Sequence, residues 1–474
     1  MIGTTLRKFR ILYFLFVVMG LAISACAPIR ITSTPAVETG QSTKSFAKTT
    51  PTIVPATNVP VVGVDPAALN ELQIQFIHPW TGDALDELVL MVDEFNQTNE
   101  WGIHVIMTAP GSAAMVTSKT WEGIANQQPP NVMAAPASFI LAVDEREGLV
   151  VDLAPFLDAA GYGFPADAIE DFLPLFWDEL MVDDERLGIP AQQSALLLAY
   201  NKTWAEELGF LAPPSTDEEF RNQMCAANAS FLKDDDTTND GLGGWLINTD
   251  PVAMLSWLTA FGVDPRTSDG YRFSGEAGEA AFGFLQALKN DSCAWVGRTD
   301  HDRAYFANRQ ALAVAVWLQD LPALVGDLER AGSQDEWTLI PFPGGADQVI
   351  TAAGIAYAVL QNEPAEDLAA WLFIRWLSEP AQQARLLDRF GTLPLSGQAE
   401  ALVDWDAQSP QLKTVLQYRD LLGLQPVDAD WMVIIPVLED AGWQLLKADI
   451  PSEQIPQLLT ELDALILELA ERYP

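Results

Sequence analysis

Apolar residues along the chain follow two different periods, and each period predicts a different element. From Leu72 to Ile77 apolar and polar positions alternate, which is typical of a strand with one buried face. Leu88, Val92 and Phe95 then recur at a spacing of three or four residues and predict a helix. A second strand is predicted at 103–107. The folded part of the chain therefore begins with the order strand, helix, strand.

The same two periods continue to the end of the chain. Further strands are predicted at 132–135, 195–200, 337–341 and 354–360, and further helices at 365–377 and 456–473. Strands that alternate with helices favour βαβ units and a mostly parallel sheet. In such sheets ligands lie beyond the carboxyl ends of the strands. The pattern therefore predicts an α/β fold with Trp80, Ser112 and residues 135–138 along one edge of the sheet.

The first residues have the pattern of an export signal. Basic residues precede an apolar run at 11–23, which is shorter than the roughly 20 residues of a permanent membrane span. The run ends in Ile23-Ser24-Ala25-Cys26, which resembles the lipobox of bacterial lipoproteins. That resemblance implies a signal peptide at 1–25, cleavage before Cys26 and lipidation of its thiol. The alternative is an ordinary signal peptide that contains a cysteine.

Residues 26–70 are rich in Thr, Pro and Ser and lack a sustained apolar period. Such a segment cannot bury a core, so we predict a flexible tether. Its r.m.s. reach would be roughly 35–40 Å. We therefore expect an extracytoplasmic body that is attached to the bacterial cell membrane through its lipid anchor alone.

Composition excludes several classes of partner and cofactor. The formal net charge of −39 leaves nothing to neutralise phosphates, so no nucleic acid is expected. The chain has only three His, none near another His or Cys in sequence, so neither a metal site nor a cofactor is predicted. Cys225 and Cys293 form an even pair outside the cell, which favours one disulfide. Two separate buried thiols are the alternative.

Several segments occur in an order that resembles a known family. They are HPWTG after the first strand, then GIPAQQSALLLAYNKTW, WTLIPFPGG, DLAAWLFIRWLSEPAQQ and GTLPL. From about Glu71 to its end the chain is similar to the extracellular solute-binding proteins of sugar ABC importers, the class that includes maltose-binding protein. The resemblance implies a two-lobe, periplasmic-binding-protein-like (type II) α/β fold with a hinge and a ligand cleft between the lobes. By analogy the lobes are 71–187 with 338–393, and 188–337 with 394–474.

The resemblance also implies a function. A monomeric lipoprotein of this class captures a mono- or oligosaccharide and delivers it to the permease of an ABC transporter, and it is not an enzyme. A cell-surface glycoside hydrolase is the alternative from another class, because hydrolysis needs only a pair of carboxylates and the chain has 65 acidic residues. A non-sugar solute such as a polyamine, or a sensor in place of a permease, also remains open.

Aromatic side chains are the first candidates for sugar contact, since the C–H faces of sugar rings lie flat on aromatic rings. Trp80 follows the first strand, and Trp317 ends an apolar strand where the family places a ligand-facing aromatic residue or a turn. Trp431 lies where the maltose-binding relatives carry a stacking aromatic residue. Trp257 stands in an apolar helical pattern, so a core position is its alternative.

Polar residues near the same loops are candidates for sugar hydroxyls. Gln192 and Gln193 precede a strand at the expected hinge, and each amide supplies a donor and an acceptor. Thr81 and Ser112 belong to loops after strands. Gly354 would let the backbone approach a ligand closely, or would only break a strand.

Overall fold

The computed structural model describes residues 63–268, 270–298, 301–344, 348–447 and 450–472. Cys26, the predicted signal peptide and most of the predicted tether lie outside these ranges. Within them, no helix is both long enough and apolar enough to span a membrane.

The folded body begins earlier than the sequence pattern indicated. The tether was predicted to reach residue 70, but Pro66–Leu69 form a 3₁₀ helix, η2. The carboxylate of Asp65 accepts a hydrogen bond from the backbone N–H of Ala67 at 3.0 Å and caps this helix. Leu69 is fully buried in the core. The predicted end of the tether at residue 70 is therefore wrong. One buried leucine among polar and small residues is enough to hold this segment against the core.

The first strands of the central sheet are those that the pattern predicted. β1 (Gln73–Ile77) lies between β2 (His104–Thr108) and β3 (Val132–Ala135), and all three run parallel. β13 (Ile350–Val359) pairs with β3 in the antiparallel sense. The carboxyl ends of β1 and β2 therefore meet at one edge, where their loops can share a site.

One long strand joins the two halves of the sheet. β6 (Ile189–Asn201) pairs with β13 through its first half. Through its second half it pairs with β11 (Ala313–Trp317) and β12 (Trp337–Ile340), both antiparallel. The predicted strand at 195–200 is thus only the apolar end of β6. Its beginning, which contains Pro190 and two Gln, was not visible as a strand because its pattern is not one of alternation.

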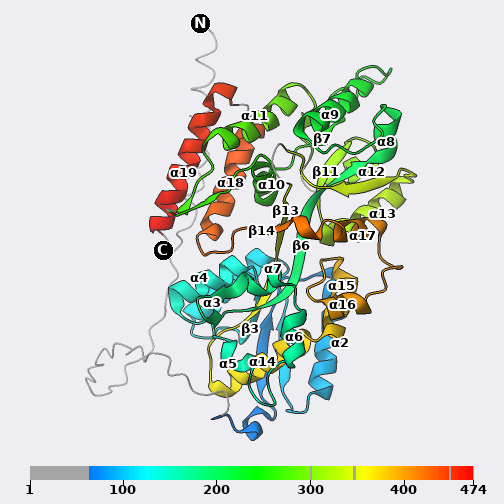
Figure 1. Cartoon of the computed structure of the whole chain (residues 1–474). Helices are drawn as coiled ribbons and strands as arrows, with labels where there is room; N and C mark the ends of the chain where they lie inside the picture. Colours follow the sequence, from blue (N-terminus) through cyan, green and yellow to red (C-terminus); the bar gives the residue numbers. More distant parts are fainter. Residues whose placement is uncertain (1–62, 269, 299–300, 345–347, 448–449, 473–474) are drawn as a thin grey trace, which may run out of the picture. The chain divides into compact units, whose positions relative to one another are not determined.

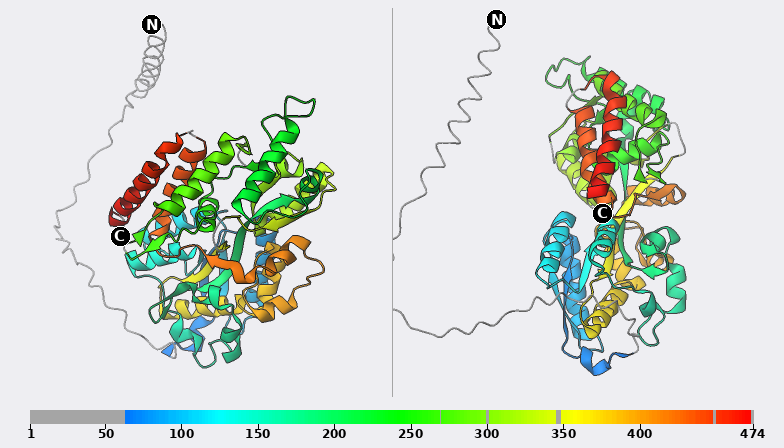
Figure 2. Two further views of the ribbon diagram at one scale, coloured as in Figure 1. Left: turned by 45° about the horizontal axis from the view of Figure 1, so that its top comes forward. Right: turned by 90° about the vertical axis from the view of Figure 1, so that its left-hand side faces the viewer.

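The helices form two groups around this sheet (Figure 1). The first group surrounds β1–β3 and includes α2 (Gly82–Thr98), α3 (Ala113–Ala125), α4 (Ala137–Glu147), α14 (Pro364–Leu377) and α15 (Pro380–Phe390). The second group includes α9 (Asp217–Phe231), α10 (Pro251–Ala260), α11 (Glu276–Asn290), α18 (Trp431–Leu446) and α19 (Ile455–Arg472). The right-hand view of Figure 2 shows the same separation from another direction.

The predicted disulfide is present in the second group. Cys225 of α9 is bonded to Cys293, with the two Cα atoms 4.2 Å apart. Cys293 directly precedes the short strand β10 (Ala294–Trp295), which pairs with β7 (Trp245–Leu246). The bond therefore joins α9 to an edge of the sheet, and the alternative of two separate thiols is wrong.

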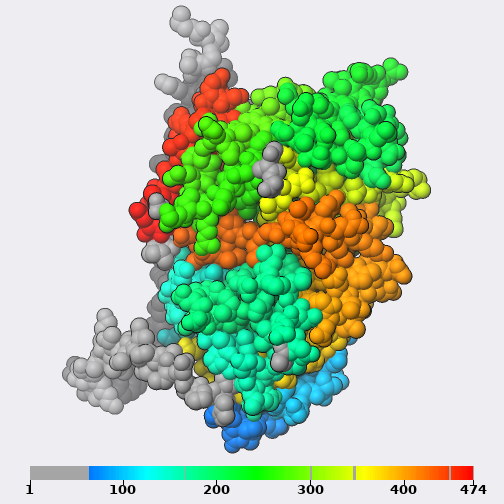
Figure 3. Space-filling model, in the orientation of Figure 1, coloured from blue at the N-terminus to red at the C-terminus, as the bar shows by residue number. Residues whose placement is uncertain are grey.

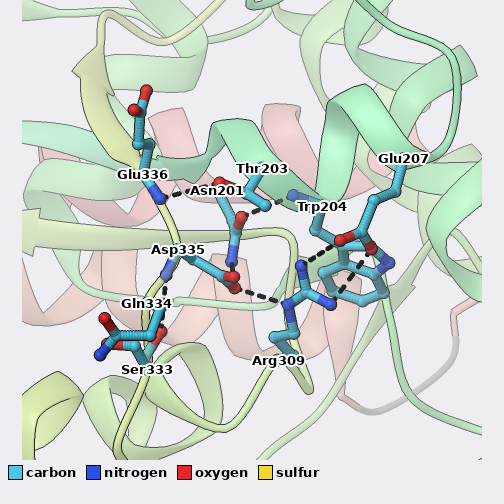
Figure 4. Close-up of polar contacts among 9 residues, drawn as sticks. All are labelled: Asn201, Thr203, Trp204, Glu207, Arg309, Ser333, Gln334, Asp335 and Glu336. Carbon is cyan, nitrogen blue, oxygen red and sulfur yellow. Dashed lines mark hydrogen bonds and ion pairs between the residues drawn. The ribbon is translucent and has the colours of Figure 1, made fainter.

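A polar network holds the far end of β6 (Figure 4). Asp335 accepts hydrogen bonds from Arg309 at 2.6 Å and from Asn201, the last residue of β6, at 2.7 Å. Arg309 also donates to both carboxylate oxygens of Glu207, at 2.8 and 3.1 Å. Glu207 ends α8 (Lys202–Glu207). This network fixes the turn from β6 into α8 far from β1.

Two contacts bear on the predicted lobe boundaries, which remain a prediction. β12 pairs with the half of β6 that also carries β11, although the boundary at 338 assigns it to the first lobe. The backbone N–H of Leu173 bonds to the carbonyl of Leu395 at 2.9 Å, although the boundary at 394 separates these residues. The orange segment, which includes β14 (Leu422–Leu424), belongs to the second predicted lobe. In the space-filling view it lies between the green and the cyan elements (Figure 3).

Candidate ligand-binding cleft

A cleft of about 760 Å³ opens where the loop after β1 faces the first half of β6 and the end of β11. Its lining residues are Pro79–Ala84, Ser112, Ala113, Gln192, Ser194, Trp317, Gln319, Asp320, Pro322, Ala323, Ala353–Ile355, Arg389 and Phe390. Most of the predicted ligand residues are among them, namely Trp80, Thr81, Ser112, Gln192, Trp317 and Gly354. Segments that are far apart in the chain therefore converge at this cleft. Of the residues that the strand pattern placed at one edge of the sheet, Trp80 and Ser112 line it and 135–138 do not.

Trp80 connects the loop after β1 to the crossing strand. Its indole Nε1 donates a hydrogen bond to Oε1 of Gln192. Its ring lies nearly parallel to that of Phe390, with centroids 5.4 Å apart and an angle of 21° between the planes. Only 7% of Trp80 is exposed. The ring is thus mostly part of the wall, and an edge rather than a free face reaches the cleft.

Trp317 exposes more of its side chain than Trp80 does. It is the last residue of β11 and is half-buried. The 3₁₀ helix η4 (Leu318–Asp320) begins directly after it, which turns the chain away from the strand direction. Trp317 lines the cleft and packs against the core of the second group of helices, whereas Trp80 belongs to the core around β1.

Hydrogen-bonding groups surround these rings. Ser194 Oγ donates to Oε1 of Gln319, and Gln192 Oε1 accepts from Trp80. Both amides thus use their oxygens on protein partners, so that the Nε2 groups of Gln192 and Gln319 are the donors a ligand would meet. Ser112 caps α3, because its Oγ accepts the backbone N–H of Met115 at 3.2 Å.

Charged groups at the cleft are few and mostly acidic. Burial raises the pKa of Asp320, and the nearby charge of Arg303, at 3.8 Å, opposes that shift. Asp83 lies in the first turn of α2. The guanidinium of Arg389 is 3.5 Å from a carboxylate oxygen of Glu87, which also pairs with Arg385 at 2.8 Å. The cleft therefore offers carboxylate acceptors together with amide donors, a set that suits hydroxyl groups.

Three predicted ligand residues lie elsewhere. Trp257 and Trp431 are fully buried in the core of the second group of helices. Trp257 packs against Trp245 and Phe342, with centroids 5.3 and 5.1 Å away. These two predictions are corrected: both indoles are core residues in this structure. The reason is that neighbours from distant segments enclose them on every side.

Gln193 is the third correction. It is fully buried, points away from Gln192 because side chains alternate along a strand, and donates to Oε2 of Glu179 at 2.6 Å. Gly354 does line the cleft, but its main role is close packing of strands. A Cβ at this position would lie 2.1 Å from the carbonyl oxygen of Gln192.

Sequence reasoning missed Gln319, Asp320, Arg389 and Phe390. Gln319 and Asp320 lie in η4, which begins directly after β11, so the rule that sites lie beyond strand ends could have found them. Arg389 and Phe390 end α15, and no local pattern distinguishes them from the rest of that amphipathic helix. Among the residues that the structure describes, no group of His, Cys, Asp and Glu is arranged to hold a metal ion.

A second hollow of about 610 Å³ lies beside β14 and the segment after α10. Its lining is mostly apolar and includes Leu255, Val263, Val349, Leu424 and Val427. None of the predicted ligand residues lines it. With fewer polar groups to orient a solute, it is the weaker candidate for a binding site.

Comparison with known proteins places the chain in a family. Residues 90–414 match the family model of the bacterial extracellular solute-binding proteins. The match covers more than half of the chain, and the chain therefore belongs to this family, whose members are extracytoplasmic binding proteins. The predicted family, fold and general function are confirmed at this level.

Individual similar proteins agree with that assignment. A binding protein of Brucella abortus (strain 2308) is 23% identical over 313 residues, which are 64% of this chain and 70% of the Brucella protein. The crystal structure of the cyclic alpha-maltosyl-1,6-maltose binding protein from Arthrobacter globiformis has a TM-score of 0.68 and 18% identity, over 84% of this chain and 99% of that one. UgpB from Mycobacterium tuberculosis, in complex with glycerophosphocholine, has a TM-score of 0.69 and 15% identity, over 84% and 98%. At these identities the solved structures establish the fold, a two-lobe mixed α/β architecture.

Proposed function

We propose that this protein captures a sugar in the cleft between Trp80 and Trp317 and delivers it to an ABC transporter permease. The observation that carries the proposal is Trp317, a half-buried indole that lines a cleft of about 760 Å³ together with the amide of Gln192. An aromatic face beside amide and carboxylate groups suits the two surfaces of a sugar. The family membership and the sugar bound by the Arthrobacter protein support the same conclusion.

The lobes and the anchor complete the proposal. The lobes, 71–187 with 338–393 and 188–337 with 394–474, would close on the sugar by bending of β6 and β13, and the protein would act as a monomer without catalysing a reaction. Signal peptide 1–25 would be removed and Cys26 lipidated. Cys26→Ser should then release the protein from the membrane fraction without changing its sugar affinity.

A binding screen tests the proposal. Purified protein is mixed with maltotriose, other neutral mono- and oligosaccharides, glycerophosphocholine and spermidine, and melting temperature and Trp fluorescence are recorded. A bound sugar at 100 times its Kd should stabilise the protein by about 2.7 kcal/mol. If only glycerophosphocholine or spermidine changes these two signals, the natural solute is not a sugar. Release of new reducing ends from an oligosaccharide would favour the alternative function, a cell-surface glycoside hydrolase.

A matched pair of variants locates the site. Trp317→Ala should weaken sugar binding at least tenfold, because the stacking face is lost. Trp443→Ala is the control, since Trp443 lies on α18, is 49% exposed and does not line the cleft. Equal sugar affinities of the two variants would show that Trp317 does not contact the sugar.

A further inference from the structure

A buried carboxyl group lies behind the floor of the cleft. Glu179 belongs to the 3₁₀ helix η3 (Asp178–Leu180) and is almost completely buried. Its Oε2 accepts a hydrogen bond from Nε2 of Gln193 at 2.6 Å. Burial raises the pKa of Glu179 to about 7, and the hydrogen bond from Gln193 only partly opposes this shift. The sugar-binding proposal makes no use of this group.

Gln193 stands where three segments meet. Its backbone pairs with Gly354 of β13, and its carbonyl accepts the N–H of Leu393 at 2.8 Å. Its side-chain Oε1 is buried and has no hydrogen-bond partner within the described part of the chain. A Cβ on Gly354 would lie 2.4 Å from that oxygen, so the amide is packed directly against β13. The position of this amide therefore depends on Glu179.

The unpaired oxygen indicates that two arrangements compete. An ionised Glu179 accepts from the amide N–H₂ and leaves the amide oxygen without a donor. A protonated Glu179 carries an O–H, which the oxygen can accept once the amide turns over. In the second arrangement the amide nitrogen takes the place of the oxygen and lacks a partner instead. The proton on Glu179 therefore decides whether the nitrogen or the oxygen of the amide bonds to the carboxyl group.

The effect can reach the cleft through one peptide unit. Gln192 is the next residue of β6, and its side chain points to the opposite face, where it accepts from Trp80. A change in how Gln193 is held against β13 thus alters the strand that places Gln192. We propose that Glu179 is a positioning residue of the cleft, whose proton sets how Gln193 holds β6 beneath Gln192, so that solute affinity changes as the pH passes through neutrality. The consequence for affinity rests on the proposed function.

Other charged groups around η3 do not replace Glu179 in this role. They are Asp178 on η3, Glu185 and Arg186 on β5 (Glu185–Arg186), Asp144, Glu145, Arg146 and Glu147 on α4, and Tyr357 on β13. α7 (Pro174–Trp177) contributes no charge. The guanidinium of Arg186 donates to the carbonyl of Trp177 and lies 4.1 Å from the centre of its ring. Burial and the bond to Gln193 are the causes of the shift at Glu179.

A ligand-free experiment tests the coupling first. The full-length protein is labelled with 5-fluorotryptophan, the ¹⁹F signal of Trp80 is assigned with Trp80→Phe, and pH is varied from 5 to 9. We expect the Trp80 signal to shift with a midpoint near pH 7, and Glu179→Gln to abolish this shift. A signal that does not move, or that moves equally in Glu179→Gln, overturns the proposal. This arm does not depend on which solute the protein binds.

The second arm measures affinity for the best sugar of the screen, beginning with maltotriose. Between pH 5.5 and 8.5 the Kd should change about fivefold, the low end of typical couplings, and the Kd of Glu179→Gln should be independent of pH. Asp367→Asn is the matched control, because burial raises the pKa of Asp367 to about 6 but its carboxylate accepts the backbone N–H of Asn362 at 2.9 Å rather than the amide of Gln193. A pH dependence that survives in Glu179→Gln, or vanishes in Asp367→Asn, contradicts the proposal. Absence of any sugar binding would instead contradict the proposed function.

Discussion

The indole N–H of Trp80 donates a hydrogen bond to the side-chain oxygen of Gln192, although the two residues are 112 positions apart in the chain. Trp80 belongs to the loop after β1, and Gln192 to the strand that joins the two halves of the sheet. The bond therefore connects one wall of the cleft to its floor. Ligand binding in a two-lobe protein depends on such hydrogen bonds, because they hold the polar groups of the cleft in position before the solute binds.

Removal of this acceptor should affect both stability and binding. Gln192→Leu leaves the nearly buried indole N–H without a partner, so the free energy of unfolding should fall by about 1–3 kcal/mol. Sugar affinity should fall about tenfold, which corresponds to 1.4 kcal/mol. Urea unfolding and titration calorimetry measure the two effects. Gln457→Leu serves as control, since Gln457 is exposed on α19 and bonds only to Glu461. If both variants behave alike, the bond to Trp80 contributes little.

The close approach of β6 and β13 should tolerate no side chain at Gly354. In Gly354→Ala the new Cβ would lie 2.1 Å from the carbonyl oxygen of Gln192, so the strands must shift. Overpacking of this kind costs about 1–3 kcal/mol. Gly283→Ala is the contrasting variant, because a Cβ there meets nothing within 4 Å on α11, and helix propensity should add about 0.5–1 kcal/mol. Unfolding curves of the two variants should therefore move in opposite directions.

His78 should make the protein sensitive to acid. It is fully buried, neither ring nitrogen has a partner in the described ranges, and burial lowers its pKa to about 4. The unfolded chain binds a proton near pH 6.5, so the stabilising contribution is present above pH 6.5 and is lost as the pH falls towards 4. The change amounts to about 3 kcal/mol over this window.

Replacement of His78 provides the check. His78→Phe should flatten the profile of unfolding free energy between pH 6.5 and 4, whereas His104→Gln, a change at an exposed position of β2, should leave it unchanged. Parallel profiles for the wild type and His78→Phe would show that other groups cause the acid sensitivity.

The disulfide should contribute strongly to the stability of the second group of helices. Cys225 and Cys293 are separated by 68 positions, and the chain-entropy model assigns about 4 kcal/mol to a loop of this length. Replacement of both cysteines by Ala should lower the unfolding midpoint accordingly. Thiol titration of the unreduced Cys26→Ser protein should find no free thiol, and two free thiols would contradict the bond.

Local patterns were sufficient to predict much of the fold. β3 was predicted at 132–135 and occurs there, and α14 was predicted at 365–377 and begins one residue earlier. Both are short-range features, since burial of one face or a continuous apolar run is recorded in neighbouring residues. The first half of β6 was missed, because its pairing with β13 depends on residues more than 150 positions away.

The tryptophans illustrate which features the sequence determined and which the tertiary structure decided. The sequence pattern determined β1, the loop that carries Trp80 and the apolar strand that Trp317 ends. The position of Gln192 in the cleft depends on the first half of β6, which the pattern did not predict. Which indole keeps an exposed face was decided only by tertiary packing. Trp257 stands in a helix that is apolar on all sides, so its period indicates no preferred face, and rings from Trp245 and Phe342 enclose it. Burial is a property of neighbours brought from distant segments, and one sequence does not state which segments those are.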